Sequence, residues 1–165
     1  MGINLEKFQQ SDFHYYFALV SDERVMAQIT ESSIPLEEAQ GNFKALLERN
    51  KKYADSGSYK IFDASTHVYL GLGHITPDEN KGGEAEIGYM IVPEHWGKGY
   101  GTEIAGALIT KAVAAGITSL KAIIDPQNIP SRKILRRYGF QSEKVCEIGG
   151  LPAEVLYKVI EVRDS

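Results

Sequence analysis

The sequence contains one cysteine, no long apolar stretch and no run of basic residues. Since Cys146 is the single cysteine among 165 residues, no disulfide framework can form within the chain. No segment approaches the roughly 18 consecutive apolar residues of a membrane-spanning helix. Lysine and arginine number 18 against 22 aspartates and glutamates, which gives a formal net charge of −4 and no basic stripe for nucleic acid. These absences predict a cytoplasmic protein with neither a nucleic-acid nor a membrane partner.

The composition is that of a globular protein that builds an ordinary core. Hydrophobic residues make up 43% and charged residues 24% of the chain. Nine tyrosines and six phenylalanines add large buried areas, so a core can form without disulfides or a metal. The length fits one domain, expected to span residues 1–165.

The N-terminal third predicts one short strand and two helices. The strand is expected at residues 3–5, and Ser11 is expected to cap the first helix, because a serine oxygen can accept a hydrogen bond from an unpaired N–H group. The second helix follows Ser33 and ends before Gly57. Its apolar residues recur with helical spacing, at Leu36, Ala39, Phe43, Leu46 and Tyr53.

The remainder alternates between strand-like and helix-like patterns. Gly149-Gly150 is expected to form a tight hairpin. The fold class is therefore α+β: a mixed, mostly antiparallel sheet of six or seven strands, flanked by about four helices. Strands are expected at 59–63, 68–76, 84–92, 120–125, 141–148 and 151–162, and helices at 99–115 and 131–138.

A glycine-rich loop lies between an expected strand and an expected helix. Gly97, Gly99 and Gly101 allow sharp turns and a close approach of the backbone to a ligand. The first N–H groups of the helix lack intrahelical partners, and the helix dipole favours an anion there. The loop is therefore suited to a phosphate.

Spacing alone leaves several interpretations of this loop. A Walker A loop is excluded, because Lys98 is followed by Gly99 instead of serine or threonine. A dinucleotide-binding turn would use Gly97 and Gly99, with Asp125 as the ribose-binding acid. Two features disfavour it: four residues, 93–96, separate the strand from the glycines, and repeated strand–helix–strand units are missing. A flexible glycine-rich linker is the third interpretation.

Two longer segments carry a family resemblance. Glu86–Val92 followed by Trp96–Glu103 resembles the acyl-CoA motif of the GNAT acetyltransferase superfamily, and Asn128–Leu135 with Tyr138–Phe140 resembles its next motif. The chain is most similar to the branch that includes ribosomal-protein N-terminal acetyltransferases, where an aromatic residue at the Trp96 position is common. The resemblance implies transfer of an acetyl group from acetyl-CoA to an amine, without a metal. The acceptor would be a small molecule or a peptide, and a homodimer is possible.

The resemblance also implies which residues contact the cofactor. The loop would bind the diphosphate, and the preceding strand end would pair with the pantetheine arm, freed by a bulge at Gly88. A backbone N–H near Ile91 would stabilise the oxyanion. Asn128 matches a cofactor-contacting asparagine, although a turn former is the alternative. The full set is Met90, Ile91, Val92, Gly97, Lys98, Gly99, Tyr100, Gly101, Thr102, Asn128 and Ser131.

The catalytic groups are less completely matched. Glu86 occupies the position of the family's carboxylate base, Glu84 on the same strand face is its rival, and a water-mediated route is a third option. Ser131 is the candidate acid or, alternatively, the N-cap of its helix. Tyr138 is a second candidate acid. Leu135 occupies the position where many members carry a tyrosine acid, so a non-catalytic CoA-binding or sensor domain is the alternative function.

Overall fold

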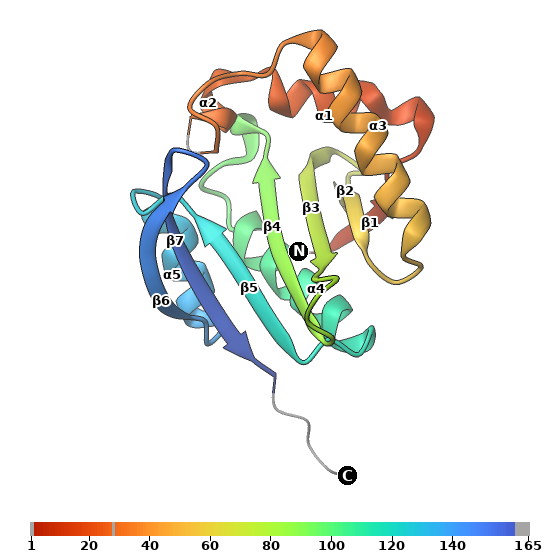
Figure 1. Cartoon of the computed structure of the whole chain (residues 1–165). Helices are drawn as coiled ribbons and strands as arrows, with labels where there is room; N and C mark the ends of the chain where they lie inside the picture. Colours follow the sequence, from red (N-terminus) through yellow and green to blue (C-terminus); the bar gives the residue numbers. More distant parts are fainter. Residues whose placement is uncertain (1, 28, 161–165) are drawn as a thin grey trace.

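The computed structural model of the chain describes residues 2–27 and 29–160 (Figure 1). Within these residues, seven strands form one sheet in the order β1-β2-β3-β4-β5-β7-β6. Every neighbouring pair is antiparallel except β4–β5, which is parallel. The strands are β1 (Ile3–Lys7), β2 (Gly57–Asp63), β3 (Tyr69–Pro77), β4 (Glu84–Ile91), β5 (Ser119–Ile124), β6 (Gln141–Ile148) and β7 (Leu151–Val159). The mixed, mostly antiparallel sheet expected from the sequence is confirmed.

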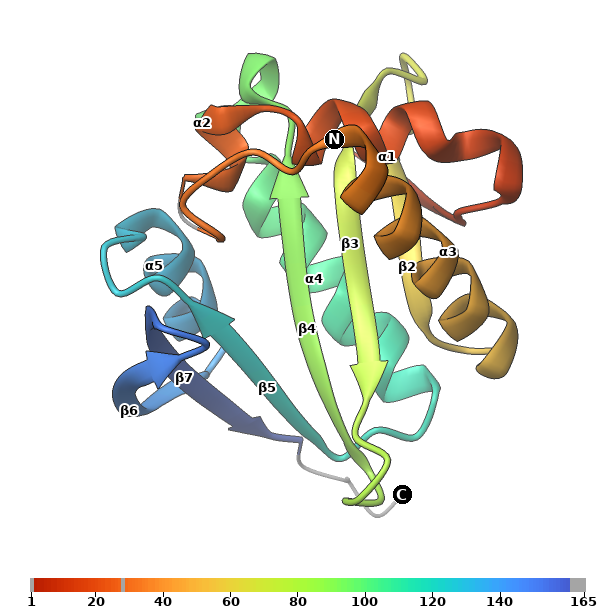
Figure 2. The ribbon, with the colours of Figure 1, turned by 45° about the horizontal axis from the view of Figure 1, so that its top comes forward.

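The helices lie on both faces of this sheet (Figures 1 and 2). The described residues include the α-helices α1 (Phe13–Val20), α2 (Glu23–Met26), α3 (Leu36–Lys52), α4 (Tyr100–Ala114) and α5 (Ile129–Arg137), and short 3-10 turns at Gln10–Asp12 and Pro93–His95. Helices α4 and α5 cover one face, and α1 and α3 pack on the other. No helix in the described part of the chain is long and apolar enough to cross a membrane.

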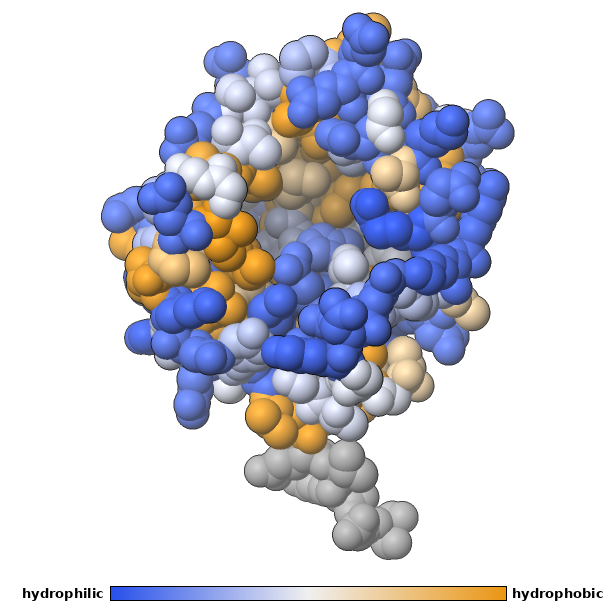
Figure 3. All heavy atoms as spheres, viewed as in Figure 1, coloured by the Kyte–Doolittle hydropathy of each residue, from blue (hydrophilic) through white to orange (hydrophobic). Residues whose placement is uncertain are grey.

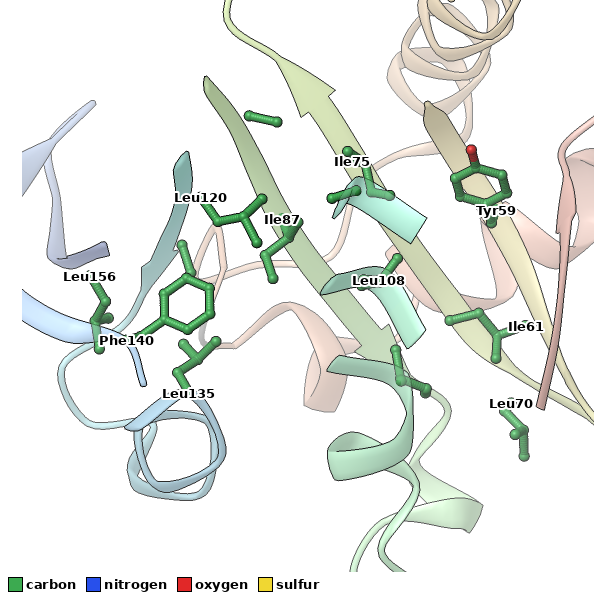
Figure 4. Close-up of a cluster of buried hydrophobic side chains, with 14 residues drawn as sticks. Tyr59, Ile61, Leu70, Ile75, Ile87, Leu108, Leu120, Leu135, Phe140 and Leu156 are labelled. Atoms are coloured by element: carbon green, nitrogen blue, oxygen red, sulfur yellow. The ribbon is translucent and has the colours of Figure 1, made fainter. Parts of the chain in front are cut away.

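Two apolar clusters hold these layers together. The α4 and α5 side contains the larger cluster, which Figure 4 shows around Ile87, Leu108 and Phe140. The α1 and α3 side contains a second cluster around Leu19 and Phe43. Because successive strand side chains point to opposite faces, β4 contributes to both clusters. Ala85 and Ile87 belong to the larger cluster, and Met90 packs against the second.

The parallel pair fixes the position of the glycine loop. Parallel neighbours need a crossover connection, and the segment from Pro93 through α4 supplies it between β4 and β5. The loop therefore lies at the carboxyl end of a central strand. The hairpin expected at Gly149-Gly150 is also confirmed, since both residues have positive φ, 58° and 83°.

The structure differs from the sequence prediction at several helix ends. Ser11 does not cap α1, because it lies inside the 3-10 turn Gln10–Asp12 that leads into the helix. Helix α2 was not expected; its cap is Asp22, whose side chain accepts the N–H of Arg24. Helix α5 begins at Ile129 rather than Ser131.

Candidate active site

Strands β4 and β5 pair over three residues and then separate. Their register runs from Glu84 opposite Ser119 to Glu86 opposite Lys121 and stops there, while β4 continues to Ile91. The two strands thus form a V that opens toward the glycine loop. Figure 3 shows a hollow in this part of the surface, over the region where β4 and β5 diverge in Figure 1.

The backbone of Ile91 faces the open side of the V. Val92 N–H donates to Leu70 O of β3 at 2.9 Å, so by the two-residue period of a strand the N–H and C=O of Ile91 and Tyr89 point toward β5. Val92 O accepts the N–H of His95, which leaves neither backbone group of Val92 available. The register therefore narrows the predicted pantetheine pairing: Ile91 offers backbone groups to the V, whereas Met90 and Val92 are turned toward β3.

The expected bulge at Gly88 is wrong. The pairing of β3 with β4 runs unbroken from Gly71 opposite Ile91 to Pro77 opposite Ala85, and the strands separate without a register shift. Gly88 has a different constraint, because a Cβ atom there would lie 2.5 Å from Nε2 of His74. The missing side chain makes room for the imidazole ring.

The glycine loop presents a set of unused backbone donors. Gly97 and Gly99 have φ of 72° and 86°, a region in which other residues are strained. Within the described residues, no backbone hydrogen bond outside the regular helices uses the N–H groups from Gly97 to Thr102. Lys98 is exposed beside them. Free donors at the start of the 15-residue helix α4 suit an anion such as a diphosphate.

The first turn of α4 is anchored to the end of strand β2. Tyr100 donates its hydroxyl hydrogen to Oδ2 of Asp63 at 2.8 Å, and Oδ1 of Asp63 accepts the N–H groups of Ser65 and Thr66. The hydrogen bonds from the Thr66 N–H, the Tyr100 hydroxyl and the Ser65 N–H lower the pKa of Asp63 to about 2. The ionised carboxylate of Asp63 therefore holds the glycine loop and the start of α4 in place across the neutral pH range.

Trp96 lies at the entrance of the loop and was assigned no role from the sequence. Its indole N–H donates to Ile91 O at 2.8 Å, although the residue is 48% exposed. The contact fixes the strand end to the loop, and it occupies one lone pair of the carbonyl that faces the V.

Two hydroxyl groups meet on the α5 side of the V. The Oδ1 atom of Asn128 caps α5 by accepting the N–H of Ser131 at 3.3 Å. Ser131 is therefore not the cap, and its own Oγ lies 3.4 Å from the hydroxyl of Tyr89. Burial raises the pKa of Tyr89, and the hydrogen bond with Ser131 partly opposes this rise. Tyr89 could have been suspected from its place on the strand, three residues after Glu86.

A buried ion pair holds the loop before α5. The guanidinium of Arg132 binds both carboxylate oxygens of Glu154 on β7 and also the carbonyl of Pro126. Glu154 is only 2% exposed. Its pKa is lowered, and the hydrogen bonds from Arg132 are the largest cause. The pair ties the start of α5 to β7, so Asn128 and Ser131 are held against the sheet.

The other candidate acids are engaged elsewhere. Tyr138 donates its hydroxyl hydrogen to Thr102 O at 2.7 Å and packs between α4 and α5. Leu135, at the usual tyrosine position, is 2% exposed and belongs to the main core. Tyr89 and Ser131 are consequently the hydroxyls nearest the open edge of β4 among the groups considered.

The two candidate bases occupy different environments. Glu84 lies where β4 and β5 are still paired and is 9% exposed, with Lys81 Nζ at 3.9 Å. Glu86 lies at the vertex of the V, and its side chain is 34% exposed. Burial raises the pKa of Glu86, and the positive charge of Lys121 partly opposes the shift. Glu86 is therefore better placed than Glu84 to accept a proton, because its carboxylate is more exposed and its pKa is shifted toward neutral pH.

His74 on β3 lies beside Glu86 and was missed by the sequence reasoning. Its Nε2 is 4.0 Å from Oε2 of Glu86, and its Nδ1 is 3.0 Å from Oγ1 of Thr76. Burial lowers the pKa of His74 to about 4, and Arg49 adds to the shift. No motif marks this position, and only the strand register brings it to the site.

Comparison with known proteins agrees with this geometry. The model of the acetyltransferase (GNAT) domain matches residues 3–141. This chain belongs to the GNAT acetyltransferase family. The general reaction of the family is acetylation that depends on acetyl-CoA.

Relatives of this GNAT chain were found among curated proteins and solved structures. The uncharacterized N-acetyltransferase YoaA of Bacillus subtilis is 31% identical over 86 residues, which cover 48% of this chain and 49% of YoaA. The chain spans about half the length of the first curated relatives it matches.

Two solved structures share the fold at low sequence identity. RimL, a ribosomal L7/L12 α-N-protein acetyltransferase in complex with coenzyme A, has a TM-score of 0.80 at 17% identity, over 97% of this chain and 95% of RimL. Spermidine N-acetyltransferase from Vibrio cholerae, in complex with CoA and spermine, has a TM-score of 0.79 at 16% identity, over 95% of both chains. At such identities these likenesses establish the fold alone.

Proposed function

We propose that this protein transfers the acetyl group of acetyl-CoA to a primary amine by direct attack on the thioester. The observation that carries the proposal is the junction of the V with the glycine loop. An extended pantetheine arm would pair with the free edge at Tyr89 and Ile91 while the loop N–H groups hold the diphosphate. Asn128 and Ser131 would line the opposite wall.

The chemical steps follow from the groups around the V. An amine must lose a proton before it attacks, since free amines have pKa values of about 8 to 10. Glu86 would draw that proton from the amine, directly or through a neighbouring group. The N–H of Ile91 would stabilise the oxyanion. The leaving thiolate would receive a proton from Tyr89 or Ser131, which fill the role that Leu135 leaves open.

The acceptor class is a matter for experiment. RimL is named for acetylation of a protein N-terminus, and the Vibrio cholerae enzyme for spermidine. Both classes are candidates for this chain, as are small-molecule amines. The likeness to the N-terminal acetyltransferase branch, the cytoplasmic location and the homodimer stay predictions.

An acceptor panel tests the proposal. Acetyl-CoA consumption is measured with peptides, polyamines, amino acids and aminoglycosides, and the acetylated product is identified by mass spectrometry. Turnover with at least one primary amine is expected. CoA binding without turnover on any amine would instead favour a sensor domain.

A further inference from the structure

We propose that His74 is the immediate acceptor of the amine proton and that Glu86 is its charged partner. The inference rests on the proposed acetyltransferase function and assigns to β3 a catalytic residue that no motif marks.

The ring of His74 lies over β4 on the side of Glu86 that leads to the open end. In the β3–β4 register, His74 is opposite Gly88 and Thr76 is opposite Glu86. The ring occupies the space above Gly88, as the 2.5 Å distance from its Nε2 to a Cβ built there shows. Since a strand rises about 3.3 Å per residue, the Cα atom of Gly88 is roughly 7 Å further along β4 than that of Glu86, while Nε2 stays 4.0 Å from Oε2 of Glu86.

The hydrogen bond to Thr76 is compatible with a ring whose Nε2 is free. When Nδ1 carries the hydrogen, Thr76 Oγ1, 3.0 Å away, accepts it and Nε2 keeps a lone pair. Nε2 and Oε2 of Glu86 are 4.0 Å apart, so an amine nitrogen or a water can donate a hydrogen bond to each. The side chains of His74 and Glu86 are 26% and 34% exposed, so both are accessible from solvent.

The ring of His74 depends on Glu86 for the charge that this role needs. Burial and Arg49 lower the pKa of His74 to about 4, so the imidazole is neutral at pH 7 but a weak base on its own. The groups that face it are Arg49 from α3, Glu86 from β4 with Lys121 behind it on β5, and the uncharged Ser58 from β2. The carboxylate of Glu86 would stabilise the imidazolium as it forms.

The proton balance is complete with acetyl-CoA and an amine alone. Nε2 takes one proton from the ammonium, and the amine then forms a C–N bond to the thioester carbon. The electron pair of the C–S bond leaves with sulfur as that bond breaks. The attacking nitrogen, now positively charged, loses a second proton to the solvent. The thiolate takes a proton from a nearby hydroxyl, which regains one from water. His74 returns its proton to water.

The test compares His74→Gln, Glu86→Gln and the double variant with the parent, and it uses exposed His14→Gln as a matched control. We expect His74→Gln to lower kcat about 100-fold and to flatten the acid limb of the pH–rate profile, with acetyl-CoA affinity unchanged. The double variant should lose no more than the worse single variant, because the residues act as a unit. Added imidazole should restore part of the rate of His74→Ala.

Two results distinguish a failure of the His74 inference from a failure of the proposed acetyltransferase function. A parent that acetylates an amine while His74→Gln keeps the same kcat and pH profile would overturn this inference and leave the proposed function intact. A parent that is inert on every amine would refute the function itself. Should His74→Gln unfold at the assay temperature, His74→Asn provides the same comparison, since its amide stays beside Thr76 but lacks Nε2.

Discussion

On the α4 face of the sheet the candidate cofactor site is built mainly from backbone groups, and on the α3 face the candidate base consists of side chains. The α4 side uses N–H groups of residues 97–102 and the free edge of β4. The α3 side uses Glu86 and His74, which come from neighbouring strands and touch neither loop nor helix start. The backbone half suits acetyl-CoA, on which the general reaction of the family depends, while the side-chain half can vary with the acceptor.

The comparison also separates what could be predicted from the sequence. Gly97 and Gly99 mark the backbone half, because a positive φ restricts the residue type and leaves a local pattern. His74 leaves no such pattern, because its role depends on the register that brings it over Gly88. Tyr89 has a local signal in its place on the strand, but its contact with Ser131 Oγ depends on tertiary structure, as does the capping of α5 by Asn128 instead of Ser131.

The fold was predicted more completely than the site. The strand at residues 141–148 was expected with the bounds that the structure shows, because Gly139 before it and Gly149-Gly150 after it are local signals. Helix α2 spans only four residues and is set by the Asp22 cap and by packing of Val25 and Met26. Periodicity cannot detect so short a helix.

The backbone half is tested most severely by Gly99→Glu. A side chain is strained at a φ of 86°, and a carboxylate at the helix start repels a diphosphate. CoA binding measured by calorimetry should weaken at least about 100-fold. The matched control is Gly82→Glu, since Gly82 lacks a positive φ and its Cβ would meet no atom within 4 Å. Equal CoA affinity in both variants would contradict the assignment of the glycine loop as the diphosphate-binding site.

The side-chain half is tested by Glu86→Gln against Glu84→Gln. Loss of the Glu86 carboxylate should lower kcat about 100-fold and leave CoA affinity unchanged. Glu84 lies in the paired part of β4, so its replacement should alter thermal stability more than kcat. Steady-state kinetics with the best acceptor measures both, and a larger kcat loss in Glu84→Gln would reverse the assignment.

A smaller effect is expected at Tyr89, which lies beside the candidate cofactor site on β4. Tyr89→Phe should lower kcat roughly tenfold, less than loss of the base, because a thiol has a pKa of about 8.5 and its thiolate leaves readily. Tyr138→Phe is the matched control, since its hydroxyl serves Thr102 O. If both variants keep the parent kcat, Ser131 or solvent supplies the proton.

The smallest effect concerns the acid stability of the side-chain half. Because the folded pKa of His74, about 4, lies below its ordinary value near 6.5, the unfolded chain binds the extra proton between these pH values. Unfolding free energy should therefore fall as pH drops from 6.5 to 4, and His74→Gln should remove about 1–2 kcal/mol of that fall. Denaturant titrations of both proteins at pH 6.5 and 4.5 measure the difference. Parallel losses in the two proteins would show that His74 does not titrate in this window.

Amide hydrogen exchange with and without acetyl-CoA tests the central claim most directly. The account predicts slower exchange on binding at residues 97–102 and along the open edge of β4, residues 87–91, with no change in β6. Bound acetyl-CoA that leaves both segments unprotected, or that protects β6 instead, would contradict it.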